Sequence, residues 1–185
     1  MKKIILTGAT GLIGKEAIYF LESAGYKVYC IRSNECNIFD YDSISNLFSK
    51  IKPEYLLHFA WFTGEGYLED SINQKFVDAS MNMLEQFKNN GGRKAVFAGT
   101  CFEYKFQDKP LKETDETEPQ TLYAKSKIKL YKLATEYCNK NSIDFGWGRI
   151  FYVYGHEENE KRLTPYIINN LKNNKPVEIK CGQLI

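Results

Sequence analysis

The segment Thr7-Gly8-Ala9-Thr10-Gly11-Leu12-Ile13-Gly14 follows a short apolar run that begins at Lys2, and it precedes a helical pattern. Its glycines have G-x-x-G-x-x-G spacing. Gly8 permits a tight turn, Gly11 lets the backbone approach a pyrophosphate, and Gly14 lets the helix pack close to the strand. A glycine triplet alone is weak evidence for a ligand. Between a first strand and a helix, however, it predicts a dinucleotide-binding turn.

The start of the following helix supplies the phosphate-binding groups of this turn. Backbone N–H groups at Leu12 and Ile13 are expected to face the phosphates, because a helix N-terminus carries unpaired donors and the positive end of the helix dipole. The alternative is a glycine-rich turn that binds no ligand. The second strand has to separate these two interpretations, since it contributes the residue that contacts the adenosine ribose.

Strands and helices alternate along the whole chain. The expected strands cover residues 2–7, 26–31, 55–59, 94–98 and 144–152, with a sixth starting at Val177. The expected helices cover residues 12–24, 67–90 and 122–140, one capped by Asp42 or Ser43 and running through Lys50, and one capped by Thr164 with Pro165 in its first turn. This alternation predicts a doubly wound parallel sheet with helices on both faces, an α/β fold.

Composition excludes several classes of protein. The chain has 185 residues, 43% hydrophobic and 26% charged, which suits one globular domain. No apolar run approaches the roughly 20 residues of a membrane helix, and the first residues do not resemble a secretory signal. A net charge of +2 argues against a nucleic-acid partner. Five scattered cysteines without a C-x-x-C pair predict no metal site and no disulfide framework, as in a cytoplasmic enzyme with reduced thiols.

The end of the second strand indicates the cofactor. A site selective for NAD places an acid there, roughly 20 residues after the glycines, to accept the ribose hydroxyls. This strand ends instead in Cys30-Ile31-Arg32-Ser33. A guanidinium binds a 2′-phosphate that a carboxylate would repel. Arg32, with Ser33 beside it, therefore favours NADP over NAD, which remains the alternative cofactor. In the other interpretation, Arg32 is a solvated surface residue that binds no cofactor.

A tyrosine and a lysine share one face of the helix expected at 122–140. Tyr123 and Lys127 are four residues apart, and a neighbouring ammonium should lower the phenol pKa from about 10. Such a tyrosine can protonate a carbonyl oxygen or deprotonate an alcohol. Thr100 follows the fourth strand at the sheet edge where such folds bind ligands, and its hydroxyl could hold the substrate oxygen.

The chain resembles the extended short-chain dehydrogenase/reductases, also called NAD-dependent epimerase/dehydratases. The resemblance rests on five segments that occur in the family's order and cover nearly the whole chain: Thr-Gly-Ala-Thr-Gly-Leu-Ile-Gly (7–14), Leu-His-Phe-Ala-Trp (57–61), Gly-Thr-Cys-Phe-Glu-Tyr (99–104), Tyr-Ala-Lys-Ser-Lys (123–127) and Arg-Ile-Phe-Tyr-Val-Tyr-Gly (149–155). It implies a Rossmann fold, a nucleotide-sugar substrate, a cytoplasmic location and a homodimer as an assembly to test for.

The resemblance also implies roles for individual residues. Thr100, Tyr123 and Lys127 match the catalytic triad, and Lys127 also matches the lysine that holds the nicotinamide ribose. The matching cofactor contacts are the glycine turn (Gly8, Gly11, Leu12, Ile13 and Gly14), Arg32 and Ser33, Asn37 and Ile38 beside the adenine, and Phe59, Ala60 and Trp61 under the cofactor. Arg32 and Asn37 stand where the family usually has acids, Tyr152 where many epimerases have asparagine, and His156 where proline is usual.

Other reactive residues receive plainer interpretations. His58 lies in an apolar strand and is predicted to be a core residue rather than a base. Cys101 has no evident histidine partner and is not predicted to be a nucleophile. Glu103 is expected to line the site, and Tyr104 is expected to pack in the loop.

The segments Gly-Thr-Cys-Phe-Glu-Tyr and Phe-Ala-Trp look most like those of reductases of nucleotide-linked 4-keto-6-deoxy sugars. A 4-epimerase with bound NAD and an inactive nucleotide-binding fragment remain alternatives; a dehydratase is disfavoured, because Cys101-Phe102 replaces the usual carboxylates after the threonine. Family members usually continue for more than another hundred residues, which form a substrate domain. We therefore expect residues 1–185 to be the dinucleotide-binding domain alone, with the substrate domain absent.

Overall fold

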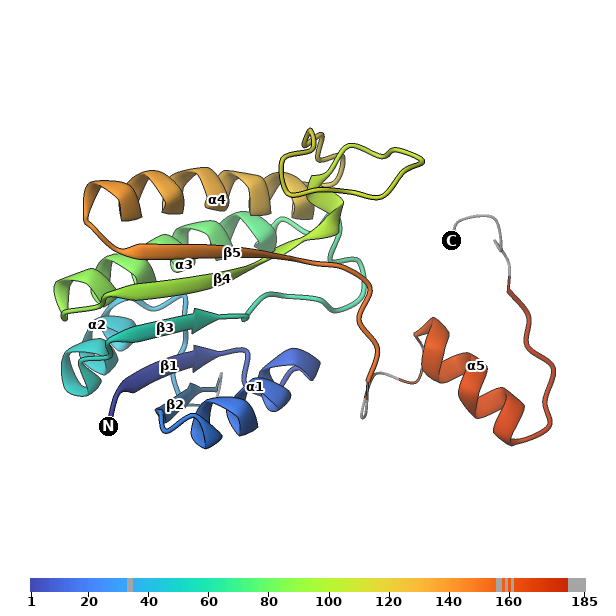
Figure 1. Ribbon diagram of the computed structural model, residues 1–185, viewed down its shortest axis with the longest axis horizontal. Helices are drawn as coiled ribbons and strands as arrows, with labels where there is room; N and C mark the ends of the chain where they lie inside the picture. Colours follow the sequence, from blue (N-terminus) through green and yellow to red (C-terminus); the bar gives the residue numbers. More distant parts are fainter. Residues whose placement is uncertain (33–34, 156–157, 159, 161, 180–185) are drawn as a thin grey trace. The chain divides into compact units, whose positions relative to one another are not determined.

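The computed structural model describes residues 1–32, 35–155, 158, 160 and 162–179, which fall into two compact units, Met1–Phe151 and Tyr152–Ile185. In the described part of the first unit, a parallel sheet has the strand order β2-β1-β3-β4-β5 (Figure 1). The strands are β1 (Lys3–Thr7), β2 (Lys27–Ile31), β3 (Tyr55–His58), β4 (Lys94–Thr100) and β5 (Asp144–Ile150). The order reverses between β1 and β3, which is where such sheets open a crevice for a ligand.

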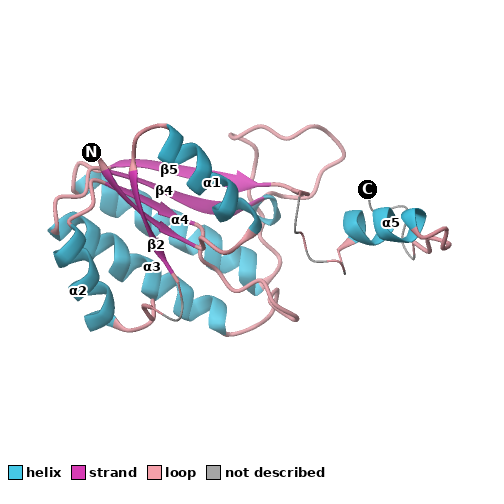
Figure 2. Cartoon of the chain, turned by 90° about the horizontal axis from the view of Figure 1, so that it is seen from below, coloured by secondary structure: helices cyan, strands magenta, loops and turns pink. Residues whose placement is uncertain are grey.

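Helices cover both faces of the sheet. α1 (Leu12–Ser23) lies on one face, and α2 (Tyr41–Ile51), α3 (Ile72–Asn89) and α4 (Leu122–Lys140) lie on the other (Figures 1 and 2). A short 3₁₀ helix, η1 (Cys101–Glu103), follows β4 directly. The doubly wound parallel sheet predicted from the alternating pattern is therefore confirmed.

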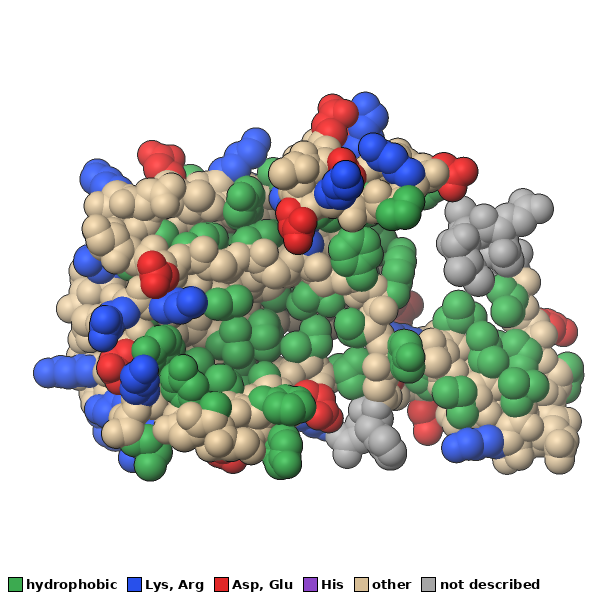
Figure 3. All heavy atoms as spheres, viewed as in Figure 1, with side chains coloured by type: hydrophobic (Ala, Val, Ile, Leu, Met, Phe, Trp, Pro, Cys, Tyr) green, Lys and Arg blue, Asp and Glu red, His purple; other side chains and the backbone are tan. Residues whose placement is uncertain are grey.

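The core lies between the sheet and the three helices α2, α3 and α4. Its largest fully buried side chains are Phe48 of α2, Phe87 of α3 and Phe97 of β4. β1 is buried along Ile4–Thr7, as expected of a central parallel strand, whereas β5 has no fully buried residue. Hydrophobic side chains also gather on the sheet face that carries α1 (Figure 3).

The starts of α2 and α3 differ from the sequence prediction. α2 is capped by Asp40, whose carboxylate accepts the N–H groups of Asp42 and Ser43, so the predicted caps are wrong. α3 begins at Ile72 rather than residue 67, because Asp70 accepts the Ile72 N–H and ends the preceding turns. Local side-chain bonds of this kind compete with helix formation, and a hydrophobic period does not reveal them.

The second unit contains α5 (Leu163–Lys172). Arg162 occupies its N-cap position without a side-chain bond, so Thr164 lies inside the helix and is not its cap. Residues 177–179 form no strand, which contradicts the start predicted at Val177; Lys180 and His156 lie outside the described residues. Within the described part of the chain, no helix is long and apolar enough to cross a membrane.

Candidate cofactor and active site

The glycine turn packs directly against the residues that follow β3. Gly8 has φ +71°, and a Cβ there would lie 2.8 Å from the Ala60 nitrogen and from the Phe59 carbonyl carbon. A Cβ on Gly14 would lie 2.1 Å from the Gly8 oxygen. Only glycine therefore fits at either position, and the turn brings the start of α1 close to the end of the strand.

The N-terminus of α1 is open to an anion. Gly11 is its N-cap and offers no side-chain bond, and the first turn holds no acid. α2 and α4, in contrast, are capped by the side chains of Asp40 and Thr121. A Cβ on Gly11 would meet only the Gly8 oxygen, at 3.3 Å. The N–H groups of the first helical residues, Leu12 and Ile13 among them, suit a phosphate.

The predicted adenosine contacts lie at the surface after β2. Arg32 places NH1 3.2 Å from Glu35 Oε1, with both side chains about half exposed. Asn37 is exposed, and its Oδ1 accepts the Phe39 N–H at 3.0 Å. Ile38 is half-buried against the core. Ser33 lies outside the described residues. The pairing of Arg32 with an acid could not be derived from spacing alone.

A buried hydrogen-bond network connects β1, β3 and α3. The Ser80 hydroxyl donates to the Phe76 oxygen at 2.6 Å, so it accepts from His58 Nε2 at 2.8 Å. Nδ1 of His58 then accepts from the Thr7 hydroxyl at 2.7 Å, and Thr7 Oγ1 accepts the Ala60 N–H at 3.1 Å. The network fixes the backbone at Ala60, where the cofactor is expected.

His58 is neutral in this network. Burial, followed by the nearby Lys127 charge, lowers the pKa of His58 to about 3. Its ring is 3% exposed and both of its nitrogens are bonded within the protein. The interpretation of His58 as a core residue is therefore confirmed. The sequence analysis missed Thr7 and Ser80 as its partners.

Thr100, Tyr123 and Lys127 converge where β4 ends. Thr100 is the last residue of β4 rather than the one after it. Tyr123 lies in the first turn of α4, its phenol interacts with the Thr100 hydroxyl, and its backbone N–H donates to the Leu68 oxygen at 2.9 Å. Lys127 Nζ lies 5.8 Å from the centre of the Tyr123 ring and donates to the Ala98 oxygen at 2.8 Å.

The electrostatics of this group differ from the prediction. Burial raises the pKa of Tyr123 to about 12, although the Thr100 contact opposes the rise. Burial also lowers the pKa of Lys127 to about 7, partly offset by the Glu103 carboxylate. The expected lowering of the tyrosine pKa by the lysine is thus wrong, because desolvation dominates the pKa of both groups. At neutral pH Tyr123 holds a proton that it could donate.

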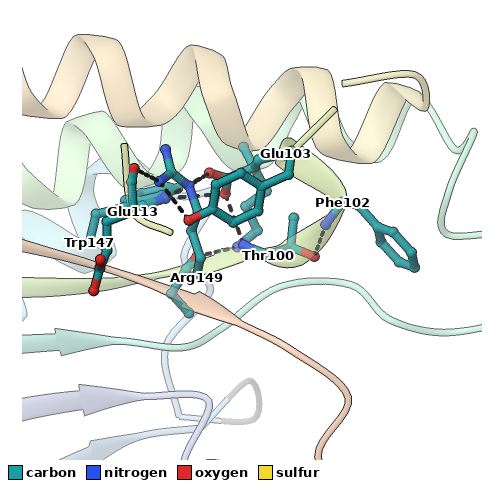
Figure 4. Close-up of polar contacts among 9 residues, drawn as sticks. Thr100, Phe102, Glu103, Glu113, Trp147 and Arg149 are labelled. Carbon is teal, nitrogen blue, oxygen red and sulfur yellow. Dashed lines mark hydrogen bonds and ion pairs between the residues drawn. The ribbon is translucent and has the colours of Figure 1, made fainter. Parts of the chain in front are cut away.

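Glu103 holds Thr100 in place from the other side (Figure 4). The Thr100 N–H donates to Glu103 Oε1 at 2.8 Å, and Thr100 Oγ1 accepts the Phe102 N–H at 3.3 Å. This capping box fixes both the backbone and the side chain of Thr100. Glu103 is fully buried and therefore supports the site rather than lining it.

Two residues of β5 donate to the Glu103 carboxylate (Figure 4). Arg149 Nε donates to Oε2 at 2.7 Å, and Trp147 Nε1 lies 3.1 Å from both oxygens. Arg149 also contacts the Tyr104 hydroxyl and the Glu113 oxygen, so Tyr104 packs in the loop as expected. A Cβ on Gly99 would lie 2.6 Å from Glu103 Oε1, so glycine at that position makes room for the carboxylate.

The Tyr123 ring has aromatic neighbours. Three rings surround it, with ring centres 5.1 Å (Tyr67), 6.2 Å (Trp61) and 6.5 Å (Phe102) from that of Tyr123.

Among the described residues no three His, Cys, Asp or Glu side chains form a metal-binding group. Four cysteines in the described part of the chain are free thiols, and burial raises the pKa of Cys101.

A parallel sheet with a glycine turn at its switch point defines a dinucleotide-binding α/β protein. The chain matches the model of the NAD dependent epimerase/dehydratase family over residues 4–183, and it belongs to that family. The resemblance found in the sequence is thereby confirmed.

Relatives in this family include sugar-modifying proteins. The chain is 28% identical over 159 residues to "Spore coat polysaccharide biosynthesis protein SpsK" of Bacillus subtilis, covering 84% of this chain and 55% of that protein. It is 29% identical over 185 residues to the GDP-L-colitose synthase of Yersinia pseudotuberculosis, covering 91% and 60%. The UDP-glucose 4-epimerase of Thermotoga maritima has the same fold, with a TM-score of 0.80 at 20% identity over 96% of this chain and 65% of that structure. The chain thus spans a little over half the length of these relatives.

Proposed function

We propose that this chain is the NADP(H)-binding part of a reductase that acts on a nucleotide-linked 4-keto-6-deoxy sugar. The observation that carries the proposal is the convergence of Thr100, Tyr123 and Lys127 at the end of β4, next to the open glycine turn. The similarity to a GDP-L-colitose synthase supports a nucleotide-linked sugar as the substrate class.

Three side chains have separate roles in the proposed reaction. The cofactor, when bound, supplies the hydride that attacks the keto carbon. Tyr123 donates its proton to the carbonyl oxygen, which becomes the new hydroxyl. Thr100 orients that oxygen with its own hydroxyl. Lys127 binds the nicotinamide ribose, and its charge stabilises the phenolate that Tyr123 leaves behind.

Arg32 supports NADP as the cofactor. Its guanidinium can form two charge-assisted bonds to a 2′-phosphate. Arg32 is paired with Glu35 at 3.2 Å, so a 2′-phosphate has to compete with that carboxylate. The same carboxylate is the one observation that favours the alternative, a 4-epimerase that retains NAD, since an acid near the end of β2 could accept the ribose hydroxyls.

The proposed reaction is tested by measuring how much NADPH is oxidised for each molecule of product formed. The complete reductase, of which this chain is the proposed part, is incubated with NADPH and a panel of nucleotide-linked 4-keto-6-deoxy sugars, and NADPH absorbance is followed against product. A reductase consumes one NADPH per product, whereas an epimerase consumes none. Tyr123→Phe keeps the ring packing and should lower turnover by roughly 10²–10⁴-fold, with little change in NADPH affinity. Turnover above half of the unmodified level in that variant would exclude Tyr123 as the acid.

Residues 1–185 alone should bind NADP(H) but no nucleotide sugar. The sheet crevice holds a dinucleotide by itself, whereas ligand pockets typically bury 70–90% of a small molecule and need a second wall. We propose that the wall comes from the part of the relatives that this chain does not match. Calorimetry with nucleotide sugars checks this. Micromolar binding together with NADPH oxidation would show that the chain is sufficient.

A further inference from the structure

Lys127 has a second contact besides the Ala98 oxygen. Its ammonium lies 3.7 Å from the centre of the Trp61 ring, which is well inside the range of a cation–π interaction. Lys127 is only 3% exposed, so little water reaches the charge. A desolvated contact of this kind is stronger than one at the surface.

The Trp61 ring is itself held in place. Its Nε1 donates to Asn73 Oδ1 at 2.7 Å, and it stacks on Phe76 with 4.9 Å between ring centres. Asn73 is fully buried, and its amide donates to the Tyr67 oxygen at 2.6 Å and the Asp70 oxygen at 2.8 Å. The turns before α3 therefore fix Asn73, and Asn73 fixes the indole that faces the lysine.

The other charged or titratable groups near Lys127 come from three elements. Glu103 on η1 favours the ammonium. His58 on β3 is neutral, and Tyr123 on the same helix is protonated. The Ala98 oxygen accepts a hydrogen bond from either an amine or an ammonium, whereas the face of an indole attracts only the cation. Trp61 and Glu103 thus both favour the charged form and oppose the burial that disfavours it.

We propose that Trp61, anchored by Asn73, is a positioning residue that keeps Lys127 charged and aimed at the site beside Tyr123. The proposal rests on the proposed function for the role of Lys127, but the contact itself exists without substrate. The proposal assigns Trp61 the role of positioning Lys127, in addition to the cofactor contact that the family resemblance implies.

The first test needs no substrate. The chain has two tryptophans, so its indole N–H groups give two NMR signals, which Trp147→Phe assigns. On raising the pH through neutrality, the Trp61 signal should shift in one step as Lys127 loses its proton. That step should vanish in Lys127→Met, while the Trp147 signal serves as an internal reference. A Trp61 signal that does not move, or a step that persists in Lys127→Met, would overturn the proposal.

The second test compares two replacements of Trp61. Phe keeps a ring face, whereas Leu keeps apolar bulk without one. NADPH affinity, measured by nucleotide fluorescence against pH, should fall above the Lys127 pKa, and this fall should begin about one pH unit lower in Trp61→Leu. Trp61→Phe should stay near the unmodified profile. Equal shifts in both variants, or none in either, would assign Trp61 to packing alone, and thermal unfolding checks that both fold.

The two tests separate this proposal from the proposed function. Absence of turnover by the complete reductase with every sugar would count against the proposed function, but it would leave the indole titration and the NADPH profile intact. Turnover with an unchanged pH profile in Trp61→Leu would leave the reductase standing and refute the role of Trp61.

Discussion

The turn after β1 and the edge after β4 are built in opposite ways. The turn is built almost entirely from backbone, because neighbouring backbone atoms leave no room for a Cβ at Gly8 or Gly14. The edge after β4 is built from buried side chains, and the Glu103 carboxylate alone accepts bonds from Thr100, Trp147 and Arg149. An anion bound by backbone N–H groups needs room close to the backbone, whereas a hydroxyl that orients a substrate has to be held in one conformation. Empty space at the glycine turn and dense packing at the β4 edge thus suit the two parts of the proposed site.

Removing the charge at the β4 edge should have the largest effect. Glu103→Gln keeps the shape but leaves the Arg149 guanidinium, 14% exposed, without its partner. Breaking a buried ion pair costs about 3–5 kcal/mol, so urea unfolding should show a loss of this size. Glu116→Gln, which breaks the exposed pair with Lys105, is the matched control and should change stability little. Equal losses would mean that burial does not distinguish the two pairs.

Adding a methyl group to the glycine turn should come next. Gly14→Ala forces a Cβ to within 2.1 Å of the Gly8 oxygen, and such overpacking costs typically 1–3 kcal/mol. Gly11→Ala is its control, because its Cβ meets only one atom, at 3.3 Å. Gly11→Ala should fold normally yet bind NADPH more weakly, since the methyl occupies space meant for the pyrophosphate. Thermal unfolding measures the loss of stability, and NADPH titration measures the loss of binding. Similar melting temperatures for the two variants would contradict the expected destabilisation by Gly14→Ala.

His58 lies on β3, between β1 and β4, and should make the chain sensitive to acid. Its pKa is lowered from 6.5 to about 3 in the folded state, so the unfolded state binds the proton first as the pH falls. The free energy of unfolding should drop by up to about 1.4 kcal/mol per pH unit from about pH 6.5 towards pH 3, and should be unaffected by His58 above that window. His58→Gln keeps a donor and an acceptor but cannot titrate there. Urea unfolding across the window should give the variant a shallower slope; identical slopes would rule out this cause.

The smallest change in stability belongs to the Arg32–Glu35 pair. Both side chains are about half exposed, and such pairs contribute less than about 1 kcal/mol because solvent screens them. Glu35→Gln should nevertheless strengthen NADPH binding by freeing Arg32, and Arg32→Asp should reverse the preference for NADPH over NADH. Nucleotide fluorescence measures both. Equal or better binding of NADH by the unmodified chain would refute NADP selectivity.

The glycine turn could be predicted from sequence, whereas the support of the β4 edge could not. The turn is local, since its three glycines and the strand and helix beside them all lie within residues 3–23. Glu103 and Arg149 are 46 residues apart, and nothing in their spacing indicates that β4 and β5 pair in the register Thr100↔Ile150. Both side chains are buried only once the sheet has assembled, and their spacing in the sequence does not show this burial.

The same distinction applies to the helices. α4 spans Leu122–Lys140 as predicted, since its apolar period and the Thr121 cap agree. α3 was predicted five residues too long at its start, because Asp70 accepts a backbone N–H there in competition with the helix. The predicted effect of Lys127 on Tyr123 failed for a different reason, since helical spacing gives proximity but not solvent exposure.

The network through Thr7, His58 and Ser80 has a kinetic consequence. Thr7 is 51 residues from His58 and 53 from Ala60, so these bonds close only after two intervening βα units have found their places. Contacts of high sequence separation come at the cost of loop closure and form late. We therefore expect damage to the network to accelerate unfolding while leaving the folding rate nearly unchanged. The residues that fix the backbone at Ala60 are therefore expected to slow unfolding rather than to nucleate the fold.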